Sequence, residues 1–473
     1  MVFVNTRCYN FHGKVVKSVF FKKVDATKGP LIKLIFIYTV PIILSTILQH
    51  LFEVADKAVL GNMAGTTAVA SIAATTTVSS LIINGAVGLS SGTSIVLARF
   101  VGQKNEEKIR KTIDTSILTS LFVGLLVALA GILLAPYFLT VTDCPAECYN
   151  GALIYMRILM AAAPVTLLYN YGSAILRTLG DSQRPLVYII IAGLVNVGLN
   201  VILCLILPQK VVAVAVATVA SKLISAVLVL RRLCRLEDSA RVDVKRLCFD
   251  LHSLASIFRF GIPASISQLV LPLGNLQITT AINSYGADAL AGHSASISVE
   301  SISYAITVGF ANAALTFMGQ NIGASHGKRV RKTFWLCLIY CAAIAGSTGV
   351  LSYLTGELWL GIIVGRSSAE AIRYGMARMF YVALFMVIHA VNSILISAMK
   401  AFGYPMLTSM TNVVMTLGFR IVWMQLIYPL YPKFVTIMQC YTVSWALNFL
   451  FYILFTAIVY RRYVKTGACK DIR

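Results

Sequence analysis

Residues 48–57 read Leu-Gln-His-Leu-Phe-Glu-Val-Ala-Asp-Lys and lie within an apolar segment that runs from Ile32 to about Leu60. A segment of this length predicts a membrane-spanning helix, because about 20 apolar residues cross the hydrocarbon core of a bilayer. Charged groups at such depth cost roughly 2.5–3.5 kcal/mol each on insertion scales, and they usually line a cavity or an ion path. The stretch therefore predicts a membrane protein with a functional polar group on its first span.

Four side chains of this stretch can titrate or carry charge, namely His50, Glu53, Asp56 and Lys57. The first three are spaced by three residues and fall near one face of a helix. Lys57 follows Glu53 by four residues, which is the favourable order for an ion pair. Two interpretations of Glu53 stay open, a self-neutralised pair with Lys57 or a functional acid. Asp56 stands outside that pair and is the sharper candidate.

The composition excludes several classes of protein. Of the 473 residues, 58% are hydrophobic and 12% are charged, whereas a soluble domain carries about 25% charged residues. The chain has no ATP-binding P-loop and no paired His-Glu zinc motif. The string Gly88-Leu89-Ser90-Ser91-Gly92 matches a nucleophile motif but lies within a predicted span, where small residues serve helix packing. An ATPase and an enzyme are therefore disfavoured.

The apolar runs predict an all-α membrane protein with twelve spans joined by mostly short connections. Their expected ranges are 32–60, 67–99, 113–137, 151–177, 185–207, 210–231, 255–284, 288–318, 333–355, 370–400, 405–430 and 436–460. The expected organisation is a cytoplasmic N-terminal segment 1–31, an N-lobe 32–231, a cytoplasmic linker 232–254, a C-lobe 255–461 and a cytoplasmic tail 462–473.

The net charge of +22 is distributed by membrane side, because lysine and arginine gather in alternate connections between the predicted spans. This positive-inside pattern predicts that both termini lie in the cytoplasm. The excess charge then indicates orientation and attraction to anionic lipid, not a nucleic-acid partner. Cys144 and Cys148 fall in a predicted outside loop, where a disulfide and two free thiols are both open.

The two sets of six spans are related as an internal repeat. With a shift of 221 residues, landmarks of the first half meet like residues of the second. The pairs include Gly88 and Gly309, Gly102 and Gly323, Arg110-Lys111-Thr112 and Arg331-Lys332-Thr333, Arg157 and Arg378, and, one residue out of step, Pro41 and Pro263. Because each half has an even number of spans, the halves are expected to be parallel, with the site between them.

Several strings, in order along the chain from Asp25 onward, resemble the multidrug and toxic compound extrusion family, in particular its bacterial Clostridium-type branch. They include Pro41-Ile42-Ile43-Leu44-Ser45 with Ala55-Asp56, Ile175-Leu176-Arg177 with Gly180-Asp181, Ala313-Ala314-Leu315-Thr316-Phe317 with Gln320-Asn321, and Gly418-Phe419-Arg420. The resemblance implies two six-helix lobes around a central cavity.

The same resemblance implies a secondary active antiporter that exports bulky cationic drugs or toxic organic compounds, by alternating access, in exchange for H+ or Na+. The alternative is a lipid-linked or polysaccharide flippase of the same broad superfamily, although twelve spans and few cavity cations argue against it. The expected partners are small organic substrates and the lipid bilayer, without nucleic acid and without a cofactor beyond the coupling ion. A monomer in the bacterial inner membrane is expected.

In one branch of that family a polar cluster of the N-lobe takes the coupling ion. The resemblance assigns this role to Asp56, Asn196, Asn200 and Thr218, and Glu53 is a further candidate. The position of Asn200 is often an acid in that branch, so Asp56 becomes the principal carrier here. Amide oxygens can ligate sodium, so a weak Na+ site is the one metal site expected. Amides also join membrane helices, and Thr218 can instead bond its own helix backbone.

Glu300 is the acid expected inside a C-lobe span, as a ligand for a cationic substrate or as a second proton site. Pairing with Arg420 is the structural alternative. Further polar residues on spans are candidate cavity lining, namely Asn170, Gln268, Asn275 and Gln277. Arg157 and Arg378 are interpreted as structural anchors. His50 and His293 are either members of proton relays or packing residues.

Overall fold

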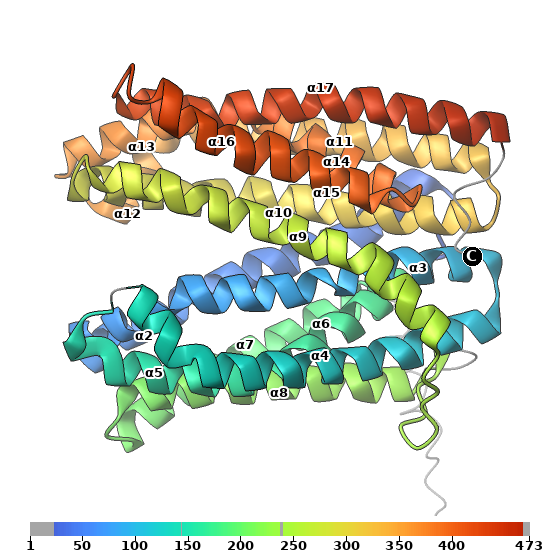
Figure 1. Ribbon diagram of the computed structural model, residues 1–473, viewed down its shortest axis with the longest axis horizontal. Coiled ribbons are helices and arrows are strands. Elements are labelled where there is room, and N and C mark those ends of the chain that lie inside the picture. The colour runs from blue at the N-terminus through green and yellow to red at the C-terminus, as the bar shows by residue number, and fades with distance from the viewer. Residues whose placement is uncertain (1–22, 143, 237–239, 467–473) are drawn as a thin grey trace, which may run out of the picture.

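The computed structural model describes residues 23–142, 144–236 and 240–466. Its regular elements are helices that lie in two layers, the N-lobe and the C-lobe (Figure 1). The N-lobe consists of α2 (Leu31–Gly88), α3 (Ser90–Gln103), α4 (Glu106–Val141), α5 (Ala146–Ala161), α6 (Ala163–Thr178), α7 (Gln183–Ile206) and α8 (Lys210–Cys234).

The C-lobe begins with α9 (Leu251–Asn283) and ends with α17 (Phe434–Thr466). Between them lie α10 (Ala287–Gly323), α11 (Gly327–Leu354), α12 (Gly356–Val364), α13 (Ala369–Val382), α14 (Met386–Ala401), α15 (Pro405–Asn412), η2 (Val413–Gly418), α16 (Phe419–Val422) and η3 (Trp423–Ile427). The stretches η2 and η3 are π-helical, so the expected span at 405–430 is wound irregularly on both sides of Arg420.

Ten helices of the described chain are long and apolar enough to cross a membrane. The pairs α5–α6 and α13–α14 bend by 45° and 46° at a short break, and counting each pair as one span gives twelve. The breaks fall at Ala162 and Ala383, which the repeat shift of 221 residues places in register. Both halves thus have the same broken helix as their fourth span.

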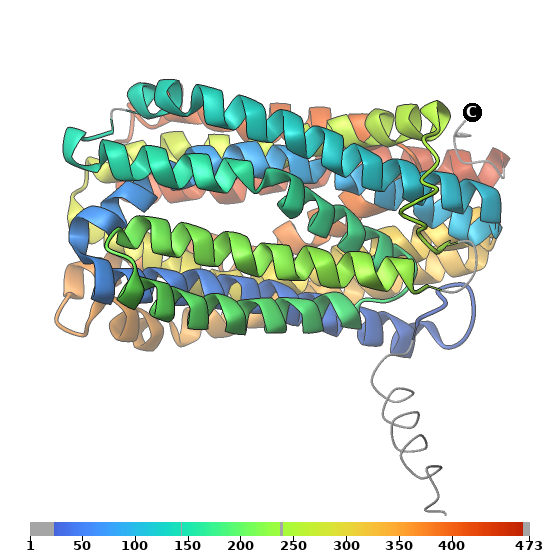
Figure 2. The same cartoon turned by 90° about the horizontal axis from the view of Figure 1, so that it is seen from below.

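The expected connection between the first two spans is different in the structure. Residues 61–66, predicted as a loop, are helical, and α2 doubles back at one end of the molecule without losing helical backbone (Figure 2). The two spans within it and its continuation α3 are Leu31–Asp56 and Val78–Gln103. The change of direction is therefore accommodated within a helix, a feature that hydrophobicity alone does not predict.

The lobes meet where α3 crosses α10, at two glycines that the repeat relates. A Cβ added to Gly102 would lie 2.0 Å from the carbonyl oxygen of Gln320, and one added to Gly323 would lie 2.2 Å from that of Arg99. Glycine at both positions lets the two backbones touch. The close approach of the lobes therefore depends on both repeats.

Two hydrogen bonds beside this crossing also follow the repeat. Arg99 Nη2 donates to the carbonyl of Ala401 over 2.8 Å, and Gln320 Nε2 donates to the carbonyl of Thr178 over 2.7 Å. Each donor belongs to one lobe and each acceptor to the other. Each acceptor also lies at the C-terminal end of a broken span, where helix carbonyls lack intrahelical partners. We call these two bonds the interlobe latch.

Candidate functional site

The N-lobe site is built on one buried face of α7. Its buried residues include Ile189, Gly193, Asn196, Asn200 and Cys204, which recur every three or four positions. This spacing places them on one side of the helix. Because α7 packs against α2 and α8, the two amides are held inside the lobe and away from lipid.

A close contact between α2 and α7 sets the position of α2 along this face of α7. A Cβ added to Gly193 would lie 1.9 Å from Cε2 of the Phe52 ring, so the ring occupies the space that a side chain would need. Phe52 is four residues before Asp56 on α2, and Gly193 is seven residues before Asn200 on α7. The aromatic contact therefore sits about one to two turns from both members of the polar contact described next.

Asp56 and the two amides meet as a polar cluster. Asn200 Nδ2 donates to Asp56 Oδ1 at 2.6 Å and to Asn196 Oδ1 at 3.4 Å. Asn200 is fully buried, and its Oδ1 has no hydrogen-bond partner in the part of the chain that the structure describes. The cluster thus offers one carboxylate and two amide oxygens, the donor types that hold a proton or a sodium ion.

The other predicted members of this cluster lie differently. Thr218 Oγ1 donates to the carbonyl of Val214 on its own helix, as the alternative interpretation expected. The side chains of Glu53 and Lys57 fall outside the described residues, so their pairing stays untested. His50 is exposed.

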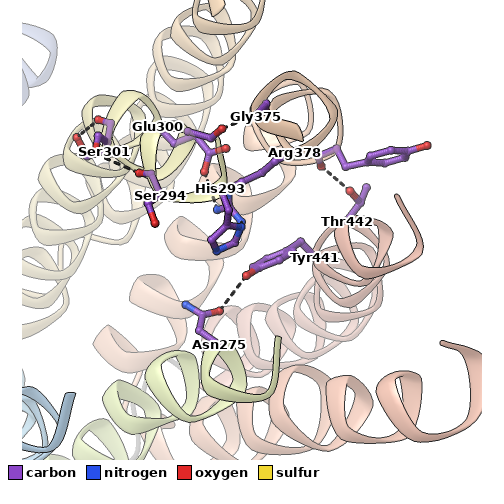
Figure 3. Close-up of polar contacts among 12 residues, drawn as sticks. Asn275, His293, Ser294, Glu300, Ser301, Gly375, Arg378, Tyr441 and Thr442 are labelled. Carbon is purple, nitrogen blue, oxygen red and sulfur yellow. Dashed lines mark hydrogen bonds and ion pairs between the residues drawn. The ribbon is translucent and has the colours of Figure 1, made fainter. Parts of the chain in front are cut away.

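The C-lobe contains a second buried cluster (Figure 3). Arg378 Nη2 on α13 lies 2.8 Å from Glu300 Oε2 on α10, and both side chains are at most 4% exposed. His293 Nδ1 lies 3.4 Å from the other terminal nitrogen of Arg378. The Tyr441 hydroxyl points to Asn275 and donates to its Oδ1 over 3.3 Å.

This geometry corrects the expected partner of Glu300, which is Arg378 and not Arg420. Arg420 on α16 instead donates to Asn275 Oδ1 on α9 over 2.9 Å. The physical reason lies in the packing, since α10 lies against α13, whereas α16 lies against α9 and α17. Arg378, interpreted from the sequence as a structural anchor, is the buried partner of Glu300.

Tyr441 on α17 joins the two arginines, and no pattern in the sequence singled it out. The guanidinium carbons of Arg378 and Arg420 lie 4.9 and 4.5 Å from the centroid of its ring. Two guanidinium groups and one carboxylate therefore share this cluster. The repeat relates Arg378 to Arg157, but the structure separates the two, since Arg157 is exposed and Arg378 is buried.

The remaining candidates for cavity lining differ in accessibility. Gln268, Asn275 and Gln277 are exposed on α9, and Asn170 is half-buried on α6. The amide of Asn170 donates to the carbonyl of Thr166 on its own helix. Asn275 alone among these four connects to the buried C-lobe cluster, through Arg420 and Tyr441.

Across the described residues, no group of three His, Cys, Asp or Glu side chains is placed to hold a metal ion. No disulfide joins Cys144 to Cys148. Among the side chains that the structure describes, the polar cluster around Asp56 offers sodium one carboxylate, that of Asp56, and the amide oxygens of Asn196 and Asn200.

The chain is similar to known proteins over most of its length. The model of the MatE family matches the chain twice, over residues 41–202 and 263–424. "Probable multidrug resistance protein YoeA" of Bacillus subtilis is 26% identical over 376 residues, covering 78% of this chain and 80% of its own. An "FAD transporter" of Shewanella oneidensis is 26% identical over 299 residues, covering 61% of this chain and 64% of its own.

Solved structures share the fold. A crystal structure of "MATE in complex with MaL6" superposes with a TM-score of 0.85 at 19% identity, over 94% of this chain and 100% of that one. A "MOP superfamily transporter from Pyrococcus furiosus", described with a binding pocket of reverse polarity, superposes with a TM-score of 0.83 at 19% identity, over 93% of this chain and 99% of that one. These likenesses confirm the predicted all-α, two-lobed membrane fold.

Proposed function

The chain belongs to the MatE family, and from this premise we propose that it exports bulky organic cations by alternating access in exchange for H+ or Na+. The observation that carries the proposal is the 2.6 Å hydrogen bond between Asn200 and Asp56, which puts a carboxylate against a buried amide inside the N-lobe. Such a site is costly in a membrane protein unless it serves transport or binding.

The cluster couples ion binding to the arrangement of the N-lobe. A proton on Asp56, or a sodium ion held by Asp56 with the oxygens of Asn196 and Asn200, neutralises the buried carboxylate. Neutralisation changes the attraction between α2 and α7, and Pro41 inside α2 lacks a backbone N–H, which permits the helix to bend there. The ion therefore favours one arrangement of the N-lobe over the other, which is what antiport requires.

In this proposal the lobes separate and rejoin at the end of the molecule where the interlobe latch lies. Arg99 and Gln320 lie near the ends of α3 and α10 that lead into the basic connections. By the positive-inside rule this end faces the cytoplasm, with both chain termini, in the inner membrane of a bacterium. The proposed division is an N-lobe at 32–231 and a C-lobe at 255–461, acting as a monomer.

A substrate between the lobes would meet Asn275 before it met Glu300, because Asn275 is exposed and Glu300 is buried and paired with Arg378. We assign Glu300 the role of fixing Arg378, Tyr441 and hence Asn275, while Gln268 and Gln277 offer further polar contacts on α9. Arg420 also has a positioning role, because it donates a hydrogen bond to Asn275 Oδ1.

One observation favours the alternative, transport of a lipid-linked or otherwise anionic substrate by the same fold. The C-lobe cluster contains the guanidinium groups of Arg378 and Arg420 but the single carboxylate of Glu300. A net positive charge beside the path would attract phosphate or carboxylate groups. The relatives include an FAD transporter as well as multidrug resistance proteins, so proteins similar to this one are named for more than one kind of substrate.

Transport in proteoliposomes tests the proposal. A fluorescent organic cation and a fluorescent organic anion are each followed under separately imposed proton and sodium gradients. We expect gradient-driven movement of the cation and its loss in Asp56→Asn. Movement of the anion alone would favour the alternative substrate class. If neither gradient moves either probe, the antiporter proposal is wrong.

A further inference from the structure

A groove of about 620 Å³ lies between α11 and α17, on the C-lobe, with α14 as its floor. Its walls are apolar and aromatic, and they include Phe334, Trp335 and Leu338 of α11, Leu395 of α14, and Ile453 and Tyr460 of α17. Trp335 is half-exposed. The groove is part of a membrane-spanning bundle, so the molecules available to fill it are lipids.

Two polar groups in the groove indicate more than an acyl chain. Arg331, the fifth residue of α11, lines it at the end nearest the basic connection, and its side chain is exposed. Thr456 lines it from α17 and is 8% exposed, yet within the described residues its Oγ1 has no hydrogen-bond partner. A buried hydroxyl usually finds an acceptor, so Thr456 Oγ1 is a donor in need of one.

The internal repeat provides a comparison within the same molecule. The N-lobe counterparts of Arg331, Phe334 and Trp335 are Arg110, Ile113 and Asp114 on α4. There the chain itself covers the helix. The backbone N–H of Cys248 donates to Asp114 Oδ2 over 3.3 Å, and Ile113 is 1% exposed.

The same helix face is thus covered by the linker in one lobe and open in the other. Apolar linker residues Leu236 and Val242 are buried in the hydrophobic core that contains Ile113. The comparison indicates that this face requires an apolar cover. In the C-lobe the cover must come from outside the described chain.

We propose that the groove binds one phospholipid from the adjacent leaflet. An acyl chain lies along the aromatic wall of α11 and α17, an ester carbonyl accepts the hydrogen bond of Thr456 Oγ1, and the phosphate pairs with Arg331. Arginine near a membrane surface attracts anionic headgroups, and its long stem can follow an apolar wall to reach them. An anionic phospholipid is therefore the preferred occupant.

The site adjoins the interlobe latch. Met318 of α10 and Phe402, the residue after α14, also line the groove. Phe402 directly follows Ala401, whose carbonyl accepts the hydrogen bond from Arg99. A lipid packed on Phe402 therefore braces the C-lobe side of the latch and stabilises the arrangement in which the lobes touch.

Native mass spectrometry of the full chain tests the proposal, after incubation with vesicles of dioleoylphosphatidylglycerol and transfer to a mild detergent. We expect one retained phospholipid per chain. Thr456→Val and Arg331→Gln should each weaken retention about tenfold, the usual effect of losing a charge-assisted or otherwise buried hydrogen bond. Vesicles of dioleoylphosphatidylcholine should load the wild-type chain less well.

The repeat supplies the matched control. Arg110→Gln removes the counterpart of Arg331 where the linker already covers the helix, and it should leave retention unchanged. Ala457→Trp, which fills the groove with a ring, should abolish retention, with thermal unfolding as the check that it folds. Equal retention in wild type and Thr456→Val, or equal loss in Arg110→Gln and Arg331→Gln, would overturn the proposal.

Discussion

The Asn200 amide donates to the Asp56 carboxylate over 2.6 Å and joins two helices whose residues are 144 positions apart. Because Asn200 also reaches Asn196, its amide nitrogen is used twice while its Oδ1 is left to accept. The arrangement is suited to an acid whose charge changes during a cycle, since the amide stabilises the carboxylate and its oxygen can accept from a protonated carboxyl.

Exchanging the two side chains tests whether coupling requires a carboxylate at position 56 itself or on either side of this contact. Asp56→Asn should abolish gradient-driven transport, because it removes the titratable group, without loss of folded protein. The double variant Asp56→Asn/Asn200→Asp moves the carboxylate to the other side of the same contact, and we expect it to recover part of the coupling. The measurement is proton- or sodium-driven efflux in proteoliposomes, with size-exclusion chromatography to verify folding. Wild-type rates in Asp56→Asn would remove this residue from the mechanism.

The packing beneath that site gives a second prediction. Gly193→Leu must displace the Phe52 ring, and we expect a loss of about 1–3 kcal/mol in unfolding free energy, the usual cost of overpacking. Coupled transport should fall as well, because α2 can no longer hold Asp56 against α7. Thermal unfolding and efflux measure the two effects.

Gly198→Leu is the control on the same helix. A Cβ at Gly198 meets no atom of the described chain within 4 Å, and the position is exposed. This variant should unfold and transport like the wild type. Equal damage from both substitutions would mean that the loss of any glycine on α7 is responsible, and the contact with Phe52 would lose its assigned role.

The features that could be predicted from the sequence are those that depend on patterns spread over many residues. Long apolar runs indicated twelve spans, and the spacing of glycines and basic residues indicated the repeat, which the two matches at Pro41 and Pro263 reproduce within one residue of the inferred shift. The resemblance placed Asp56, Asn196 and Asn200 in one cluster, and the structure brings them together. Their role in coupling stays a prediction.

What could not be predicted depends on which helices are neighbours. Arg378 and Arg420 both lie in C-lobe spans, and periodicity places each on a helix face without telling which face meets Glu300. The choice is made by packing of α10 against α13. Tyr441 was missed for the same reason, since an aromatic residue on a membrane helix usually contacts lipid or other apolar side chains.

The Glu300–Arg378 pair gives a third prediction. Breaking a buried ion pair from one side leaves an uncompensated charge, so Glu300→Gln and Arg378→Gln should each lower the unfolding free energy by about 3–5 kcal/mol. Glu300→Gln/Arg378→Gln removes both charges and should be more stable than either single variant. Thermal unfolding of the four proteins in one detergent forms the cycle. Additive losses in the double variant would contradict an energetic coupling between the two groups.

Transport by the same variants distinguishes a structural role of the Glu300–Arg378 pair from direct action on the substrate or on a proton. If Glu300 acts by fixing Arg378, Tyr441 and Asn275, the double variant should regain transport together with stability. A stable double variant that remains inactive would mean that a charge of the pair acts on the substrate or on a proton. Either result decides whether the pair has a structural role or acts on the substrate or a proton, because stability and transport are measured on the same preparation.

The fourth prediction concerns the interlobe latch. Gln320→Ala leaves the Thr178 carbonyl without its donor from the other lobe, and the loss of about 1–3 kcal/mol should favour separated lobes by roughly tenfold or more. Spin labels on Lys108→Cys and Lys328→Cys, in a background without native cysteines, report the distance between the lobes at this end. Both lysines are exposed, so labelling should not disturb packing.

The control for the latch is Gln103→Ala, the loss of an exposed amide at the end of α3. It should leave the distance distribution of the wild type unchanged, whereas Gln320→Ala should add a population at longer distance. Because the repeat pairs Gln320 with Arg99, an Arg99→Met variant should shift the distribution in the same direction. If Gln320→Ala and Arg99→Met both match the wild type, the two bonds do not hold the lobes together, and the contact through Gly102 and Gly323 must be sufficient for closure.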